Sequence, residues 1–250
     1  MTGETPWVAN MIAKYEPDAR ASGAAIVSMC GFDSIPADLG VFFLADKVRR
    51  AEGVGVSAVH ALIRAQAGVS GGTIASALNL MTDKNLSKAA ADLSIMFPRA
   101  ALESSTGGGV SMTDVVALAP DFALPTRERA FAAAAMPHIM AGVDSRVVRR
   151  TAGLLVAEGR QLAGNQYALP ALVSAHVQPG GAHNEASRAR AYGYSLTKPF
   201  EYTERLLVRN VFMAYALTGL MALATMLLRL PGVAAIARRF LPSPGEGPSA

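Results

Sequence analysis

The feature that most constrains the fold is a polar turn at residues 30–40 (CGFDSIPADLG), which separates an apolar run from a helix-forming segment. The run, residues 24–29, is short and follows Gly23, which predicts a buried strand. Pro36 is typical of the first turn of a helix, and the apolar segment after it continues to Val48. Open α/β sheets bind ligands at polar turns between a strand and a helix, so this unit predicts an α/β chain.

Two interpretations of the turn remain open. Asp33 or Ser34 can accept hydrogen bonds from the free N–H groups of the following helix, which is the commoner role for such residues. Alternatively, both side chains face a bound ligand. Cys30 is the only cysteine, which excludes a disulfide within the chain and fits a reducing compartment. A buried structural thiol is a commoner role for a single cysteine than a nucleophile.

A second candidate turn lies at residues 70–73 (SGGT), between a predicted strand at 54–65 and a predicted helix. Ser70 or Thr73 can cap this helix, which continues to Met81. Glycines followed by a helix N-terminus suit an anion or a carbonyl group. A plain strand-to-helix turn needs the same residues, so both interpretations stay open.

Periodicity, capping residues and breakers predict the remaining elements. We expect helices at 5–22, 85–97 and 141–158, loops at 103–113 and 178–190, an edge strand at 167–173, and either a strand or an alanine-rich helix at 127–135. In the helix at 141–158, Arg146, Arg149 and Arg150 are expected on the solvated face. The alternative is that an arginine pair binds a phosphate or a carboxylate.

Three kinds of site are poorly supported. Residues 53–58 match a dinucleotide-binding glycine pattern, but they follow a helix and lead into a strand, the reverse of the required order. His176 and His183 have no cysteine or carboxylate partner at metal-ligand spacing, so we expect no metal site. The net charge is only +4 and the basic residues are scattered, which argues against nucleic-acid binding.

The sequence does not identify a catalytic residue. Tyr192, Tyr194 and Tyr202 lie near one another, and reductases use tyrosine as a proton donor. Tyr194 has Lys198 four residues later, but a proline follows that lysine and prevents the helix on which such a pair depends. The catalytic proton donor therefore stays unknown at this level.

Residues 211–228 (VFMAYALTGLMALATMLL) form an uncharged apolar segment between Arg209 and Arg229. The segment accounts for much of the mean hydropathy of +0.28, which is high for an ordinary soluble domain. Eighteen residues are the lower limit for crossing a bilayer, and basic residues at both ends give no orientation. Three interpretations are open: a helix buried in the domain or a dimer interface, a helix lying on a membrane, and a spanning helix.

Five stretches together carry a family resemblance. The most specific is residues 31–40 (GFDSIPADLG), and the others are 2–7 (TGETPW), 70–76 (SGGTIAS), 145–150 (SRVVRR) and 244–249 (PGEGPS). In this order they resemble the saccharopine-dehydrogenase-like oxidoreductases, and within that group the trans-acting enoyl reductases of lipid biosynthesis. The stretches run almost from end to end of the chain.

The resemblance implies an NAD(P)-dependent oxidoreductase, an enoyl reductase acting on a lipid or polyketide precursor, with NADP or NAD as cofactor. The implied fold is α/β (mixed α+β). The C-terminal part of a Rossmann-like domain at 1–52 precedes an α+β substrate and dimerisation domain at 53–250, with a mixed or antiparallel sheet and an apolar helical segment at about 205–240. The implied cofactor-binding residues are Cys30, Gly31, Asp33 and Ser34, and the implied substrate-binding residues are Ser70, Gly71, Gly72 and Thr73.

The relatives have a glycine-rich turn upstream of the stretch that begins here at residue 2, and they continue beyond residues 244–249. We therefore expect this chain to be a fragment of such an enzyme that is inactive by itself. The alternative function is a non-catalytic, membrane- or lipid-associated interaction protein derived from the same fold.

The expected partners follow from the resemblance and from the apolar segment. They are a lipid or acyl substrate held on a carrier or synthase, a membrane surface, and a second copy of the chain in a homodimer. The expected location is cytoplasmic, peripheral at the inner face of the membrane.

Overall fold

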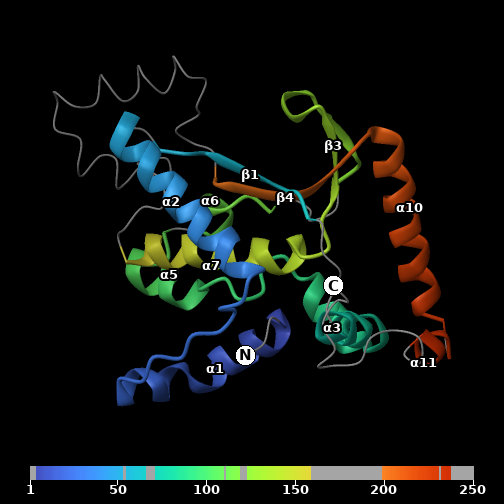
Figure 1. The fold of residues 1–250 in the computed structure, drawn as a ribbon. Helices are drawn as coiled ribbons and strands as arrows, with labels where there is room; N and C mark the ends of the chain where they lie inside the picture. The colour runs from blue at the N-terminus through green and yellow to red at the C-terminus, as the bar shows by residue number, and fades with distance from the viewer. Residues whose placement is uncertain are drawn as a thin grey trace.

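The computed structural model describes residues 4–52, 55–65, 71–109, 111–118, 123–158, 199–230 and 232–237. Its centre is a mixed four-stranded sheet in the order β1-β4-β3-β2 (Figure 1). The strands are β1 (Ala58–Ile63), β2 (Thr126–Glu128), β3 (Ala133–Pro137) and β4 (Glu201–Val208). Strand β4 pairs in parallel with β1 and antiparallel with β3, so it joins segments far apart in the sequence. The predicted mixed α/β class, mixed sheet and long apolar helix are confirmed.

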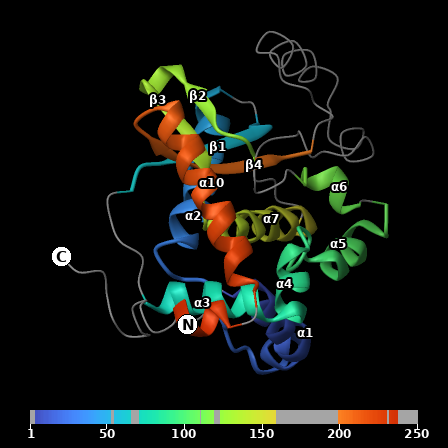
Figure 2. The same cartoon turned by 90° about the vertical axis from the view of Figure 1, so that its right-hand side faces the viewer.

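Most helices lie to one side of this sheet, and α10 runs beside β3 (Figures 1 and 2). They are α1 (Thr5–Ser22), α2 (Ser34–Glu52), α3 (Gly71–Thr82), α4 (Lys84–Ala91), α5 (Arg99–Thr106), α6 (Met112–Val115), α7 (Ala141–Ala157), α10 (Val211–Leu228) and α11 (Val233–Ala237), with a 3₁₀ turn, η1, at Arg129–Phe131. The predicted helices at 5–22, after the turn at 30–40, after Gly71 and at 141–158 are confirmed.

One face of β4 carries both parts of the core. Side chains alternate along a strand, so the even-numbered residues of β4 point to the same side of the sheet. Near its start, Tyr202 packs with Val41 of α2 and Val148 of α7. Near its end, Leu206 and Val208 pack in a separate cluster with α10. The helices α2, α7 and α10 thus share one sheet face, and Glu204 of β4 lies between the two clusters.

The strand predicted at residues 24–29 is wrong. The segment is irregular, and Ile26 and Val27 each remain 71% exposed. It does not enter the four-stranded sheet, because its backbone pairs with none of the four strands that the structure describes. An apolar run becomes a strand only where a neighbouring strand supplies hydrogen-bond partners. The apolar composition of residues 24–29 therefore predicted a strand that does not form.

The alanine run near residue 133 is the strand β3, one of the two predicted alternatives, and not a helix. All residues of β3 are buried, and Ala134 and Met136 pack against Ala214 of α10. Small side chains let α10 approach the sheet closely, and this tertiary packing outweighs the intrinsic helix preference of alanine.

Two predicted element boundaries are wrong. Helix α4 ends at Ala91 rather than near Phe97, and Asp92 leaves the helix in extended geometry. The predicted loop at 103–113 contains the end of α5 and the start of α6, so only residues 107–111 connect them. Glycine and serine content suggested a loop there, but Gly107 instead ends α5 in the left-handed conformation, with φ of 64°.

The predicted solvated face of α7 is also wrong, because Arg146 and Arg149 are each only 3% exposed. Arg146 donates to the carbonyl oxygens of Ala90 at 2.6 Å and Asp92 at 3.1 Å. Arg150 donates to the Met96 carbonyl oxygen at 2.9 Å, and Arg149 to that of Leu93 at 3.3 Å. These arginines therefore hold the irregular segment after α4 against α7, a structural role that no local pattern revealed.

The apolar segment forms one helix, α10, with the predicted bounds 211–228. The interpretation that it is buried within this chain is wrong, because Ala214 is its only buried residue. By length and composition α10 is the one helix in the described part of the chain that could cross a membrane. Its packing against β3 is considered below.

The division into domains at 1–52 and 53–250 stays a prediction. Helix α2 shares one core with β1, α7 and β4, which joins residues from both predicted domains. The predicted edge strand at 167–173, the loop at 178–190, Tyr192, Tyr194, His176, His183 and Ser70 lie outside the described residues. The glycine pattern at 53–58 is described only from Gly55 onward.

Candidate functional site

A cluster of polar side chains lies buried where α2 and α7 begin beside β4. Ser34 is the first residue of α2, Asp144 stands in the first turn of α7, and Tyr202 and Glu204 point from β4 toward these helices. These four residues are each at most 4% exposed. A buried group of acids and hydroxyls is costly unless its members satisfy one another, so their arrangement requires explanation.

Glu204 is the centre of the hydrogen-bond network. The Tyr202 hydroxyl donates to its Oε2 at 2.6 Å, and His138 Nδ1 is hydrogen-bonded to its Oε1. His138 follows β3, and its side chain is 15% exposed, so it is the most accessible member of this group. The network therefore runs from the buried interior to a partly exposed imidazole.

Asp144 adds a second carboxyl group to Glu204. The pKa of Asp144 is raised to about 8, chiefly by burial and next by the charge of the neighbouring Glu204 carboxylate. A hydrogen bond from Ser34 opposes the shift. Within the described residues, its Oδ1 atom is buried without a hydrogen-bond partner, which fits a neutral acid better than a carboxylate. Asp144 thus carries a proton at neutral pH.

The hydroxyl of Tyr202 stays protonated for related reasons. Burial raises its pKa well above the usual range, and the hydrogen bond to Glu204 and the charge of that residue add to the effect. Tyr202 therefore positions Glu204 by donating a hydrogen bond to its carboxylate.

A third carboxyl group, on a half-buried residue, lies between α2 and α7. Asp38 accepts a hydrogen bond from the Thr151 hydroxyl at 2.9 Å, which joins the two helices. Burial raises the pKa of Asp38, although this hydrogen bond lowers it. Its Oδ1 is buried without a partner among the described residues. Asp38 belongs to the resemblance motif at 31–40, so part of that motif serves helix packing.

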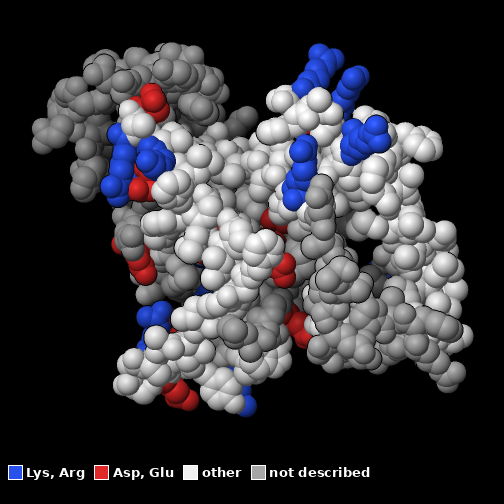
Figure 3. Space-filling view, viewed as in Figure 1, with Lys and Arg blue, Asp and Glu red and all other residues white. Residues whose placement is uncertain are grey.

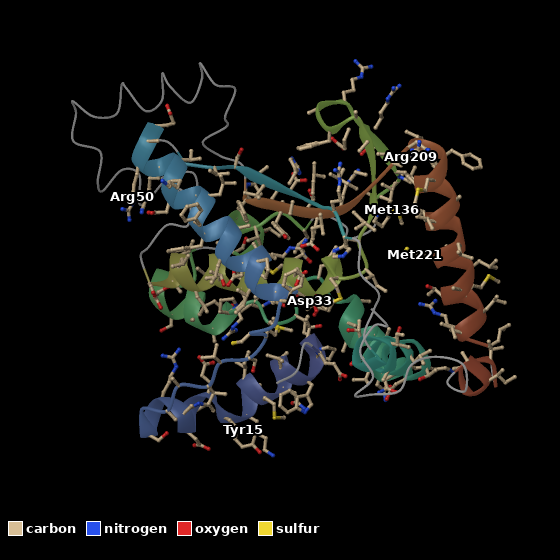
Figure 4. The ribbon with its side chains drawn as sticks, in the orientation of Figure 1. Tyr15, Asp33, Arg50, Met136, Arg209 and Met221 are labelled. Atoms are coloured by element: carbon tan, nitrogen blue, oxygen red, sulfur yellow. The ribbon has the colours of Figure 1, made fainter. Side chains whose placement is uncertain are left out.

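The four predicted cofactor-binding residues occupy different environments on one turn. Gly31 and Asp33 are exposed and Cys30 is half-buried, with its thiol donating to the carbonyl oxygens of Val27 at 3.7 Å and Ser28 at 3.6 Å. Ser34 turns inward and donates to Asp144. Figure 4 shows Asp33 at the start of α2, on the side toward α7. The turn thus presents a carboxyl outward while its hydroxyl joins the buried network.

The described part of the predicted substrate turn, Gly71–Thr73, forms the first residues of α3. Gly71 is buried, and Ser76 in the next turn donates to the Glu4 carboxylate at 3.0 Å. Helix α3 lies below α2 and α7 in both ribbon views (Figures 1 and 2). The structure therefore places the two predicted sites on different helices, and substrate binding at the second stays a prediction.

Two hollows lie near these elements. A cavity of about 20 Å³, lined by Pro137, Ser145, Tyr202 and Glu204, adjoins the buried network and has room for about one water molecule. A groove of about 500 Å³ lies between α1 and residues 23–28, with Trp7 and Tyr15 in its wall and Arg150 at its edge. Its largely apolar lining suits an apolar ligand more than a charged one.

The described residues near the start of α2 do not form a cradle for the pyrophosphate of a dinucleotide. Pyrophosphate needs a glycine-rich helix N-terminus free of negative charge, whereas Asp33, Asp144 and Glu204 place carboxyl groups near the start of α2. An exposed carboxyl such as Asp33 suits a ribose hydroxyl or an amide. In the described ranges, no group of three or more histidine, cysteine or acidic residues could hold a metal ion.

Sequence reasoning missed most of this network. Of its members, the sequence patterns had singled out only Ser34 and Tyr202 as candidate functional residues. A usable signal existed for Glu204, because an acid two residues after Tyr202 in a strand shares the same face as that aromatic residue. No comparable local signal marks His138, because only the β3–β4 pairing brings it to Glu204.

Comparison with known proteins gives a consistent result. The chain is 32% identical over 167 residues to a Mycobacterium tuberculosis protein named as a trans-acting enoyl reductase; the match covers 62% of this chain and 37% of the relative. It is 49% identical over 43 residues to a saccharopine dehydrogenase-like oxidoreductase of Arabidopsis thaliana, covering 17% of this chain and 10% of the relative.

A shorter match is to a protein whose name refers to lipid droplets. The chain is 52% identical over 44 residues to a Caenorhabditis elegans protein named lipid droplet localized protein, covering 18% of this chain and 10% of that protein. No protein-family model and no solved structure matches the chain. The similarities agree with the resemblance seen in the motifs: over part of their length, the chain is similar to proteins named as trans-acting enoyl reductases and as a saccharopine dehydrogenase-like oxidoreductase.

Proposed function

We propose that this chain is the substrate-binding region, with one edge of the dinucleotide-binding region, of an NAD(P)-dependent enoyl reductase for a lipid or polyketide precursor. The observation that carries the proposal is the similarity to a trans-acting enoyl reductase over 167 residues, which includes the stretch that contains Asp144. The buried network around Glu204 supports it, because reduction of a carbon–carbon double bond requires a proton as well as a hydride.

In this proposal, His138, Glu204 and Asp144 handle the proton. The cofactor, when bound, supplies the hydride to the β-carbon of the enoyl group, and a proton must reach the α-carbon. His138 is the partly exposed end of the network, so it is the group that reaches the substrate. Glu204 orients the imidazole, and Asp144, protonated at neutral pH, holds a proton in reserve behind it.

The cofactor would approach the turn at Cys30, Gly31, Asp33 and Ser34. Asp33 is exposed and suits a ribose hydroxyl or the carboxamide, while Ser34 links the turn to Asp144. The described residues provide carboxyl groups rather than a pyrophosphate cradle. We therefore propose that the chain alone binds NADP and NAD weakly and lacks reductase activity. Ser70, Gly71, Gly72 and Thr73 remain the proposed substrate-binding residues.

The proposed location is cytoplasmic and peripheral, at the inner face of the membrane. The apolar helix α10 and the short match to a lipid droplet localized protein support lipid association. A substrate carried on a synthase or carrier, and a homodimer, complete the proposed set of partners.

Ligand binding to the purified chain tests the proposal. We expect a trans-2-hexadecenoyl thioester of pantetheine to raise the melting temperature more than the saturated hexadecanoyl thioester, and NADPH to have little effect. Because discrimination depends on a polar group near the double bond, His138→Gln should reduce the preference for the enoyl thioester by at least about tenfold in Kd. His60→Gln is the matched control, since His60 is an exposed histidine on β1 that hydrogen-bonds Thr203 at 2.6 Å.

The outcomes separate the parts of the proposal. Equal binding of the two thioesters, or none, would contradict an enoyl reductase site. Turnover of NADPH by the chain alone would support the oxidoreductase and overturn its proposed inactivity. A His60→Gln effect as large as that of His138→Gln would remove the assigned role of His138.

A non-catalytic, lipid-associated interaction protein is the second candidate function. The exposed apolar surface of α10 favours it, because such a surface serves lipid or partner contact without chemistry. This candidate expects saturated and unsaturated acyl thioesters to bind alike, and it expects the His138→Gln variant to bind both as tightly as the parent chain.

A further inference from the structure

The outer surface of α10 is apolar and uncovered by the described part of the chain. Phe212 is 85% exposed, Met226 68% and Leu220 61%. Tyr215, Leu223 and Leu227 extend the same surface, and Leu230 and Ile236 continue it beyond the helix. Soluble domains rarely expose a continuous apolar surface of this kind, so it marks a contact with lipid or with another apolar surface.

The opposite side of α10 is attached to the sheet. Ala214 is buried against Ala134 and Met136 of β3, and Leu217 and Met221 flank this contact. Figure 4 shows Met136 and Met221 on the facing sides of β3 and α10. The helix therefore lies alongside the body of the protein, and a spanning orientation would require it to leave β3.

A basic cluster stands at the N-terminal end of α10. Arg127 and Arg129 from the β2–η1 segment and Arg209 at the end of β4 are exposed, and they line a groove of about 820 Å³ with Asn210 and Phe212. None of the three arginines forms an ion pair within the described ranges. Figure 3 shows basic side chains gathered over this end of the molecule, while the visible flank of α10 carries no charge.

The nearby charges are almost all positive. The one acid in the cluster is Glu128, a half-buried residue whose carboxylate accepts a hydrogen bond from Thr126 at 2.9 Å. Between Glu204 and Glu246 the sequence contains no acidic residue, whereas Arg229 follows the other end of α10. A basic, otherwise apolar helix surface of this type binds in the interface of an anionic bilayer.

We propose that α10 and the cluster of Arg127, Arg129 and Arg209 form a docking surface for an anionic lipid membrane. The helix lies in the plane of the interface, with Phe212, Leu220 and Met226 among the acyl chains and the arginines among the headgroup phosphates. A second copy of the chain is a poorer occupant, because paired identical surfaces would bring arginines together without carboxylates to receive them. This surface rests on the proposed peripheral location and not on the proposed reaction.

Co-sedimentation of the full chain with lipid vesicles tests the surface. We expect strong binding to vesicles of phosphatidylcholine with 30% phosphatidylglycerol and weak binding to pure phosphatidylcholine, at about 0.1 M salt. The triple variant Arg127→Gln, Arg129→Gln, Arg209→Gln should lose about 100-fold in partitioning onto the anionic vesicles, at about fivefold per arginine. The triple variant Leu220→Ser, Leu223→Ser, Met226→Ser should lose binding to both vesicles.

Matched controls exist for both variants. Arg20, Arg49 and Arg50 are exposed on α1 and α2, so changing all three to glutamine removes the same net charge elsewhere. Leu39→Ser with Phe43→Ser changes two exposed apolar residues of α2, which are 57% and 64% exposed. Neither control should alter vesicle binding.

Three results would overturn the surface. They are no sedimentation with either vesicle, an equal loss of binding in the Arg20, Arg49, Arg50 control, and a dimer in light scattering that the serine variant converts to a monomer. The last result would assign α10 to a second copy. None of these three results changes the expected difference in binding between the enoyl and the saturated thioester. Failure of the proposed membrane docking is therefore distinguishable from failure of the proposed function.

Discussion

Asp144 and Arg146 stand two residues apart in α7, and both are buried, but their side chains lie in different surroundings. The guanidinium of Arg146 donates hydrogen bonds to the carbonyl oxygens of Ala90 and Asp92. Burial raises the pKa of Asp144 to about 8, and the neighbouring carboxylate of Glu204 adds to this increase. One helical turn thus contains an arginine with a structural role and a neutral acid that belongs to the proposed proton-handling network.

The neutral state of Asp144 makes stability depend on pH. Its pKa rises from about 3.9 in the unfolded chain to about 8 in the folded protein, so the folded state binds more protons between about pH 4 and pH 8. The stability that this proton contributes is present below about pH 4 and is lost as the pH rises through 8. Asp144→Asn keeps the shape of the side chain and removes this loss.

We therefore expect the melting temperature of Asp144→Asn, measured by scanning calorimetry, to exceed that of the parent chain by about 3–8 °C at pH 8. The difference should shrink steadily toward pH 5. Asp18→Asn, at an exposed position on α1, is the control and should show no such pH trend. A difference that is constant across this pH range would show that Asp144 is ionised in the folded protein.

At the scale of elements, the joint between α5 and α7 depends on close packing at Gly153. A Cβ atom at this position would lie 2.8 Å from two ring carbons of Pro98 and 2.9 Å from Cε2 of Phe97. The proline ring cannot turn aside, so the two segments must separate to admit a methyl group. From the same helix, Arg150 donates a hydrogen bond to the carbonyl oxygen of Met96, which precedes Phe97 in this segment.

Gly153→Ala should therefore lower the free energy of unfolding by about 1–3 kcal/mol, even though alanine favours a helix more than glycine does. Urea denaturation followed by circular dichroism measures the change. Gly40→Ala in α2 is the matched control, because a Cβ atom there meets no described atom within 4 Å. It should be neutral or stabilising by about 0.5–1 kcal/mol. Equal effects at both positions would contradict the packing account.

For the whole molecule, the apolar composition is only partly explained by the core. Surface-exposed apolar side chains occur on α10, on the outer face of α2 and in residues 24–29. The central core joins α2, α5, α7, β1 and β4. Helix α1 instead joins the body through a small cluster around Val8, Met29 and Met96. Cohesion therefore decreases from the centre toward α1 and α10.

Hydrogen exchange should follow this gradient. We expect the amides of α7 and β4 to exchange only through global unfolding, because they are surrounded by the main core. Amides of α1 should exchange at least about tenfold faster, through local opening that breaks only the cluster around Val8. Mass spectrometry of peptides from α1 and α7 measures both rates in one sample. Equal protection of the two helices would show that α1 belongs to the main cooperative unit.

Vesicles provide a second whole-molecule readout. Bound lipid should slow exchange in α10 and leave α7 unchanged, which ties the docking surface to one element.

Much of the secondary structure could be predicted because its causes are local. Pro6 and Gly23 bound α1, apolar periodicity marked α7, and an uncharged segment between arginines marked α10. The candidate turn at residues 30–40 was found for the same reason, since capping residues and a proline act over a few positions. The residues that this turn faces were not predictable in this way.

The sequence by itself determined the mixed α/β class, the principal helices, the turn at Cys30–Ser34 and the family resemblance, because these depend on neighbouring residues or on matched motifs. The tertiary structure alone decided that residues 24–29 are not a strand, that the alanines of β3 are one, and that the α7 arginines are buried. It also decided that His138, Asp144, Tyr202 and Glu204 meet. Each of these outcomes depends on contacts between distant segments, above all the pairing of β4 with β1 and β3, which no local pattern encodes.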